Sequence, residues 1–139
     1  MGIKTKVKKM SYIIEGTVLE ITFANKKWKF KICGAEGYSL RKKRNDKLIN
    51  VNVLFPCEEI EENGYVEINK ETDNALIIPE SYEFYISEDF AQLCSSALAS
   101  GKKLRFVFEE VQESKEKTGV ITDVLDKKLE IVSLSLLAN

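Results

Sequence analysis

The sequence predicts a mainly β fold: an antiparallel β-barrel or split β-barrel, closed at one end by one amphipathic helix. Most of the 139 residues fall in short runs where apolar and polar side chains alternate, which is typical of strands with one buried face. Only residues 88–100 repeat their apolar side chains at helical spacing. We expect one domain over residues 12–139, preceded by a basic flexible tail over residues 1–11.

The domain begins with a predicted β-hairpin. Residues 17–23 and 27–32 alternate, and the three residues between these runs suffice only for a tight turn. Residues 34–47 are rich in glycine and in charge, and are expected to form a loop. A third strand over residues 49–55 should end at Pro56, because proline has no N–H to donate to a neighbouring strand.

Three short strands are expected next, over residues 65–68, 75–78 and 82–86. Asn63-Gly64 predicts a tight turn before the first of them, since both residue types adopt positive φ readily.

One helix is predicted over residues 88–100. Its apolar side chains recur every three or four residues and share one face: Phe90, Leu93, Cys94, Ala97 and Leu98. Ser87 is a typical N-cap residue, and Gly101 can take the left-handed conformation that ends many helices. A single helix placed late in an antiparallel chain most simply covers one end of a curled sheet.

The chain is completed by a predicted strand over residues 104–108, a charged connection over residues 109–117 and a closing hairpin. The two strands of this hairpin are expected over residues 119–125 and 129–136. In the last run the apolar positions shift at Val132, which predicts a β-bulge that bends the strand.

The order of elements over residues 88–136 resembles the later part of an OB-fold barrel, where a helix lies between the third and fourth strands. The stretch from Glu88 to Phe108 carries this resemblance as a pattern of residue classes. An OB barrel has five strands, whereas we count eight or nine alternating runs here. The resemblance therefore implies an OB-like or split barrel with additional hairpins, whose strands bind single-stranded nucleic acid in many OB folds.

The charges are sorted along the chain. Residues 1–50 carry thirteen Lys and Arg against four Asp and Glu, a net of +9, whereas residues 51–90 carry one basic and eleven acidic residues, a net of −10. The formal net charge of −1 therefore conceals two opposite segments. Such sorting of charge is informative about binding partners and assembly rather than about the fold. They either neutralise each other within one molecule or pair head to tail across two, which builds a ring or a filament.

The composition disfavours several classes of function. The chain has no histidine, the commonest general base and metal ligand, and no glycine-rich phosphate loop or serine-nucleophile motif. The three cysteines (Cys33, Cys57 and Cys94) are far apart in sequence, which favours a reducing compartment over a disulfide framework. No apolar run approaches the roughly 18 residues of a membrane span. We expect a cytoplasmic, non-catalytic protein with no cofactor, no metal site and no membrane contact.

Two sets of charged residues are the candidate sites. The basic set, a candidate for binding nucleic acid or another anion, is Lys27, Lys29, Lys31, Arg41, Lys42, Lys43 and Arg44. The acidic set, a candidate interaction surface, is Glu58, Glu59, Glu61 and Glu62. Alternation places Trp28 and Phe30 on the face opposite the strand lysines, so these rings are expected in the core rather than in a stacking platform.

Three hypotheses follow for the function. The first is a binding or assembly module that meets a protein partner, or itself, through charge-complementary surfaces. The second is an OB-type binder of single-stranded nucleic acid, and the third is a small-anion or nucleotide pocket at the basic loop. Among the thiols, Cys33 is expected on the lysine face and Cys94 in the core.

Overall fold

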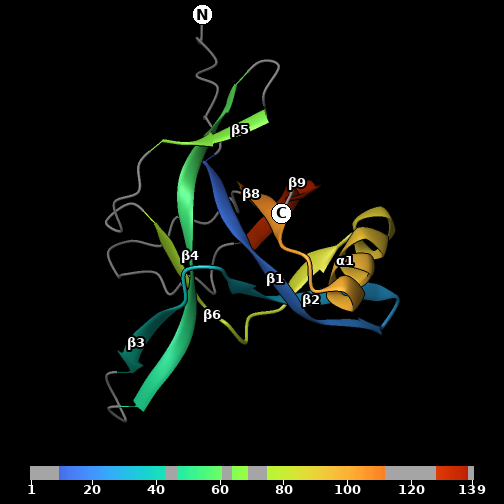
Figure 1. Ribbon diagram of the computed structural model, residues 1–139, viewed down its shortest axis with the longest axis horizontal. Helices are drawn as coiled ribbons and strands as arrows, with labels where there is room; N and C mark the ends of the chain where they lie inside the picture. Colours follow the sequence, from blue (N-terminus) through green and yellow to red (C-terminus); the bar gives the residue numbers. More distant parts are fainter. Residues whose placement is uncertain (1–9, 43–46, 61–63, 69–74, 112–127, 138–139) are drawn as a thin grey trace, which may run out of the picture.

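The computed structural model describes residues 10–42, 47–60, 64–68, 75–111 and 128–137, and it confirms a mainly antiparallel β fold with one helix (Figure 1). The strands of this part of the chain are β1 (Ser11–Ala24), β2 (Lys27–Gly34), β3 (Tyr38–Lys42), β4 (Lys47–Ile60), β5 (Gly64–Glu67), β6 (Leu76–Pro79), β7 (Phe84–Ile86), β8 (Leu104–Val111) and β9 (Lys128–Leu136). The helix α1 (Glu88–Ser100) has the predicted bounds.

The fold is organised on β1. Along one edge β1 pairs with β8, and along the other it pairs first with β4 and then with β2. Because β2 also pairs with β7, and β8 with β9, the strands follow the order β7-β2-β1-β8-β9, with α1 connecting β7 to β8. The sheet is not closed: β7 and β9 form no ladder with each other in the described ranges. This open, curled sheet is loosely consistent with the expected OB-like or split barrel.

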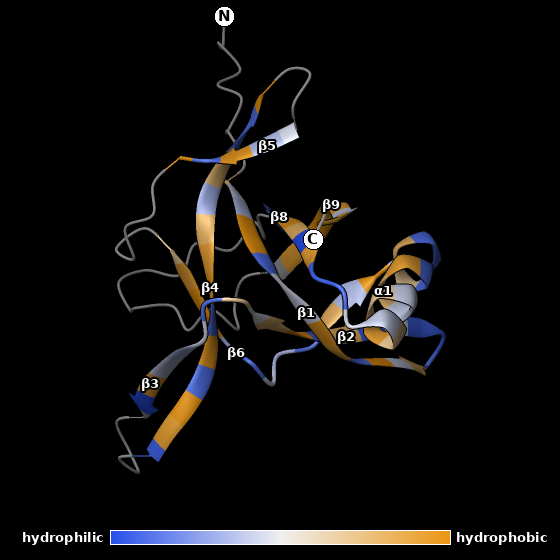
Figure 2. Ribbon diagram, viewed as in Figure 1, coloured by the Kyte–Doolittle hydropathy of each residue, from blue (hydrophilic) through white to orange (hydrophobic). Residues whose placement is uncertain are grey.

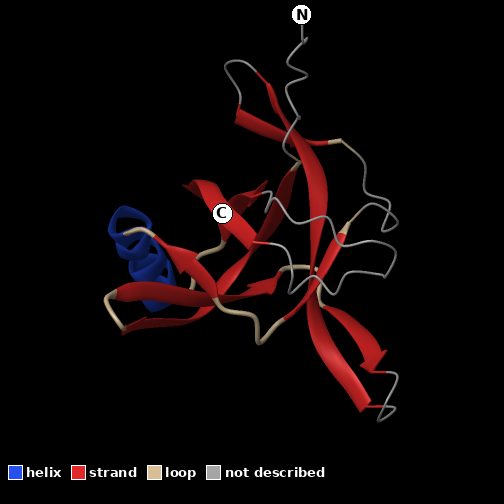
Figure 3. Ribbon diagram, turned by 180° about the vertical axis from the view of Figure 1, so that it is seen from behind, coloured by secondary structure: helices blue, strands red, loops and turns tan. Residues whose placement is uncertain are grey.

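A second limb of four strands is built around β4 and lies between β2 and β7 in the sequence. The 14-residue β4 pairs with β3 and β6 over its first half and with β1 and β5 over its second half. Seen from behind, α1 lies at one side of the molecule, and β4 with its two hairpins lies at the other (Figure 3).

A glycine and a bulge let β1 pass from one set of partners to the next. A β-carbon on Gly16 would lie 2.1 Å from the carbonyl oxygen of Cys33, so only glycine permits the close approach of β1 to β2 at this point. The register then shifts between Val18 and Glu20, which marks a bulge in β1. The two strands are joined by the predicted tight turn, in which Asn25 and Lys26 have φ values of 52° and 62°.

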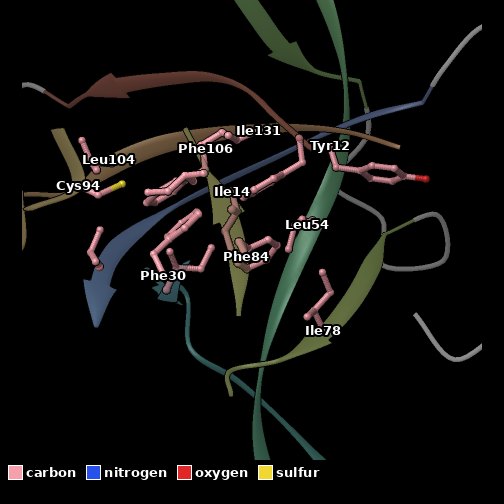
Figure 4. Packing of buried hydrophobic residues seen from close by; sticks show 14 of the residues in the cluster. Tyr12, Ile14, Phe30, Leu54, Ile78, Phe84, Cys94, Leu104, Phe106 and Ile131 are labelled. Atoms are coloured by element: carbon pink, nitrogen blue, oxygen red, sulfur yellow. The ribbon is translucent and has the colours of Figure 1, made fainter. Parts of the chain in front are cut away.

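The main core is formed by residues of the five-strand sheet together with residues of α1, β4 and β6, and Figure 4 shows part of it, including Phe30, Phe84 and Leu54. Its centre is a group of four rings that are at most 1% exposed: Phe30, Phe84, Phe106 and Phe108. A smaller cluster lies on the opposite face of β4 and β1, and consists of Ile13, Val51, Val53, Phe55, Cys57 and Val107. Since neighbouring residues of a strand face opposite sides, β4 gives Leu54 to the main core and Val53 to the smaller cluster. Figure 2 shows hydrophilic and hydrophobic bands following one another along the first half of β4.

One side of α1 is buried against the main core. The buried residues of the helix are Ala91, Cys94 and Ala97, which confirms the core position of Cys94. Leu98, expected on the same stripe, is instead 41% exposed, because the buried face is centred on the small residues of the helix. Gly101 has the predicted left-handed conformation, with a φ of 67°, whereas the Ser87 side chain makes no capping hydrogen bond.

Several expected boundaries were wrong. Residues 34–47, expected to be a loop, contain β3, because Tyr38 and Leu40 pair with apolar residues of β4. Pro56 does not end its strand, since it lies where β4 changes partners from β6 to β5 and no ladder N–H is needed. The connection expected from residue 109 starts later, because β8 continues to Val111 in register with β9.

Other expectations have different outcomes. The bulge expected in β9 is confirmed, since the register with β8 shifts at Val132. The strand expected over residues 119–125 and most of the basic tail lie outside the described residues.

Candidate interaction surfaces

Two hairpins of opposite charge lie at the two ends of β4 (Figure 1). We call residues 38–42 and 47–50 the basic hairpin, and residues 57–60 and 64–68 the acidic hairpin. Lys47 and Glu59 are twelve positions apart in extended chain, a distance of about 40 Å along β4. This distance is several times the Debye length of about 8 Å at physiological salt.

The basic hairpin combines cations with exposed apolar side chains. Arg41 of β3 stands opposite Leu48 of β4, so both side chains project from the same face. Leu48 is 62% exposed, the highest value of any large apolar residue in the described ranges. Leu40, on the other face, is also exposed. A side-chain hydrogen bond of 3.1 Å from Ser39 to Asn50 links the two strands.

The acidic hairpin has the same construction with the opposite charge. Glu58 and Glu59 are exposed at the end of β4, and Glu58 stands opposite Val66 of β5. Ile60, Val66 and Ile68 are each at least 44% exposed. Each end of β4 therefore presents charge together with apolar surface.

The structure separates the predicted basic residues into two groups. Lys27, Lys29 and Lys31 lie on β2, which pairs with β1 and β7 rather than with the basic hairpin. Arg41 is on β3, and Lys42 is described only by its backbone. Lys43 and Arg44, like Glu61 and Glu62 of the acidic set, lie outside the described residues.

Tyr85 supplies the aromatic ring that the lysine face was expected to lack. It stands opposite Lys29 in the pairing of β2 with β7, and it is 55% exposed. The ammonium groups of Lys27 and Lys29 lie 5.5 and 5.4 Å from the centre of its ring, within cation–π range. Lys31 differs, because it forms a 3.2 Å ion pair with Glu20 of β1.

A wide groove of about 1270 Å³ continues from this face toward the gap between β7 and β9. Its aromatic lining consists of Phe23, Trp28, Tyr82, Tyr85 and Phe90. Phe30 is buried as predicted, whereas Trp28 is only partly buried, and its ring packs 4.8 Å from the ring of Phe23. Both signs of charge border the groove, since Lys26 and Lys27 as well as Glu88 and Glu130 line it.

A second cleft, of about 440 Å³, lies against the face of β4 that carries the smaller apolar cluster. Its apolar floor includes Ile13, Val51, Val53 and Phe55, all buried. Its polar lining includes an ion pair of 2.7 Å between Arg105 and Glu15, and a hydrogen bond donated by the Tyr38 hydroxyl to Glu36. Glu67 of the acidic hairpin also lines it. This cleft was not predicted, because its residues come from six separate strands and a turn.

The thiols are held in their protonated forms. Burial raises the pKa of Cys94 to about 12, and burial together with the nearby Glu67 raises the pKa of Cys57 to about 11. Burial and the neighbouring Glu80 also raise the pKa of the half-buried Cys33. A nucleophilic thiol needs the opposite shift. Among the described residues, no three His, Cys, Asp or Glu side chains are close enough together to hold a metal ion.

No helix in the described ranges is long and apolar enough to span a membrane. In comparisons with protein-family models, curated proteins and solved structures, nothing matches this chain.

Proposed function

We propose that the protein is a non-catalytic binding and assembly module, which meets a protein partner or a second copy of itself through the two hairpins at the ends of β4. The observation that carries this proposal is the distance between them: Lys47 and Glu59 lie at opposite ends of one strand. A cytoplasmic location fits the three cysteines, none of which forms a disulfide.

The apolar side chains at each end make such a contact energetically reasonable. An exposed ion pair contributes only about 0–1 kcal/mol. Charge alone therefore orients the two partners and speeds their association, but adds little affinity. Burial of exposed side chains such as Leu48 and Val66 supplies the remainder, at about 25 cal/mol for each Å² removed from water. A basic end that meets an acidic end is a heterologous contact, which repeats into a ring or a filament.

Charge reversal tests the proposal. We expect wild-type protein to self-associate at low salt, as measured by light scattering, or to bind its protein partner under the same conditions. Arg41→Glu with Lys47→Glu should abolish the contact between copies, as should Glu58→Lys with Glu59→Lys. The chain that carries all four substitutions should associate again, because both ends are then reversed together.

A matched control places the same change of charge elsewhere. Lys102→Glu with Lys103→Glu alters two exposed lysines after α1 and should leave association unchanged. Association that survives either hairpin reversal, or that the fourfold variant does not recover, would contradict the proposed contact between copies.

A second candidate function is the binding of single-stranded nucleic acid on the β2–β7 face. Tyr85 between Lys27 and Lys29 favours it, because cations and a stacking ring now share one surface. The predicted resemblance to OB folds supports the same reading, because α1 comes between the third and fourth of the five strands β1, β2, β7, β8 and β9 along the chain.

Fluorescence anisotropy with a labelled single-stranded oligonucleotide tests this candidate. Lys27→Ala with Lys29→Ala should reduce the slope of log affinity against log salt by about 1.4, the value for two phosphate contacts on a single strand. Tyr85→Ala should weaken binding by about 1–3 kcal/mol, whereas Tyr85→Phe keeps the ring and should bind like wild type. No binding at low salt would remove this candidate.

A further inference from the structure

The cleft along β4 can serve as a binding site for part of a second copy, and this inference rests on the proposed function. We propose that the cleft receives the basic hairpin of a second copy, with Leu48 entering the apolar floor and Arg41 beside it meeting the carboxylates of the rim.

The cleft has the size and lining of a binding site. Its volume of about 440 Å³ lies within the range of about 300–1,000 Å³ that is typical of ligand pockets, so it can take several side chains. The floor is apolar, as shown by Val51, Val53 and Phe55. The polar groups lie around this floor, which is the usual arrangement of an apolar centre within a polar rim.

The charge of the rim selects a cationic occupant. Three carboxylates line the cleft (Glu15, Glu36 and Glu67), against the single guanidinium of Arg105. Arg105 is already paired with Glu15 at 2.7 Å. The surplus of negative charge therefore disfavours an acidic or neutral occupant and favours one that carries Lys or Arg beside an apolar side chain.

The basic hairpin has this chemistry on one face. Leu48 is 62% exposed, and Arg41 is its cross-strand neighbour. Side chains alternate along a strand, and Val51 lines the cleft, so Leu48 of the same chain projects from the opposite face of β4. Leu48 therefore cannot enter the cleft of its own molecule, and its contact with the apolar floor must join two copies.

Complementation between two defective variants tests this arrangement. Leu48→Glu destroys the hairpin contact but leaves the cleft intact, whereas Val66→Lys with Glu67→Lys blocks the cleft but leaves the hairpin intact. Neither variant alone should associate. An equimolar mixture should form a 1:1 dimer of twice the 15.8 kDa chain mass and stop there, because the remaining hairpin and cleft are both defective. Leu98→Glu, at an exposed position on α1, is the matched control and should associate like wild type.

The outcomes separate this inference from the proposed function. If the wild type associates but the mixture forms no dimer, the basic hairpin does not bind in the cleft, whereas the proposed assembly function still holds. Association of Leu48→Glu at wild-type strength would show that something other than this hairpin occupies the cleft. A wild type that remains monomeric at low salt would contradict both the binding of the hairpin in the cleft and the proposed contact between copies.

Discussion

The side-chain amide of Asn52 donates a hydrogen bond to the carbonyl oxygen of Ile32 at 2.8 Å, and so ties β4 to β2, with which it forms no ladder in the described ranges. The oxygen of the same side chain accepts a second hydrogen bond, also of 2.8 Å, from the N–H of Gly34. Asn52 is 2% exposed and takes the place of a strand partner at this edge of β2. It therefore helps to hold the limb that carries both charged hairpins against the five-strand sheet.

Asn52→Ala should lower the free energy of unfolding by about 2–4 kcal/mol. The substitution leaves the buried carbonyl of Ile32 and the partly buried N–H of Gly34 without this partner, and an unsatisfied buried group costs about 1–3 kcal/mol. Urea denaturation measures the loss as a lower midpoint at unchanged slope. Asn50→Ala on the same strand removes an exposed amide and its hydrogen bond with Ser39, and should cost no more than about 1 kcal/mol. Equal effects of the two substitutions would contradict the structural role of Asn52.

Gly16→Ala should destabilise the fold by about 3 kcal/mol or more. The new β-carbon would lie 2.1 Å from the backbone oxygen of Cys33, so β1 and β2 would have to separate. Gly34→Ala is the control on the partner strand. Its β-carbon would first meet the side-chain end of Ile14 at 3.1 Å, which can move aside, and the expected loss is about 1 kcal/mol. Thermal unfolding, followed by circular dichroism, measures the loss of stability in each variant. An equal loss in both would contradict the special role of Gly16.

Cys33 should be the first thiol to react in the native protein. It is half-buried, whereas Cys57 and Cys94 are 5% and 0% exposed, and burial raises the pKa of both to about 11 and 12. Alkylation at pH 8, followed by peptide mass spectrometry, should therefore modify Cys33 and spare the other two until urea unfolds the chain. Modification of Cys94 as fast as Cys33 in native conditions would argue against the packing of α1.

Stability should fall as the pH rises above 9. The unfolded chain releases the proton of Cys94 near the ordinary pKa of 9.0, whereas burial raises the pKa in the folded protein to about 12. Between these values the folded state holds a proton that the unfolded state has lost, so the free energy of unfolding declines with pH.

Cys94→Ala isolates this effect, because the cavity that it creates costs the same at every pH. The decline between pH 9 and 12 should be shallower in the variant, by up to about 1.4 kcal/mol per pH unit. Denaturation curves at several pH values measure the slopes. Parallel slopes in wild type and variant would show that the thiol is not buried as described.

Local pattern predicted much of the fold. The helix over residues 88–100, the turn at Asn25 and the bulge at Val132 follow from spacing and turn chemistry, and they are confirmed. The errors arose where tertiary contacts outweigh local signals. β3 forms in a charged segment because β4 lies beside it, and Pro56 is tolerated because β4 changes partners there.

The candidate sites were predicted less completely. Charge counting found the basic and acidic segments, but only the pairing of β4 with β3 and β5 puts them at opposite ends of one strand. The ring of Tyr85 was missed, although its place between Phe84 and Ile86 already put it on the face opposite the core. The cleft on β4 could not be predicted from one sequence, because its lining depends on which strands become neighbours.

The assembly of the unmodified protein is tested most directly by fluorescence-detected sedimentation of labelled chain, in buffer and in cell extract. At low salt we expect a mass that grows with concentration, or a discrete complex in extract. Near 1 M salt, where the Debye length is about 3 Å, the mass should return toward 15.8 kDa. A single species of 15.8 kDa at both salt concentrations, in buffer and in extract alike, would contradict the account.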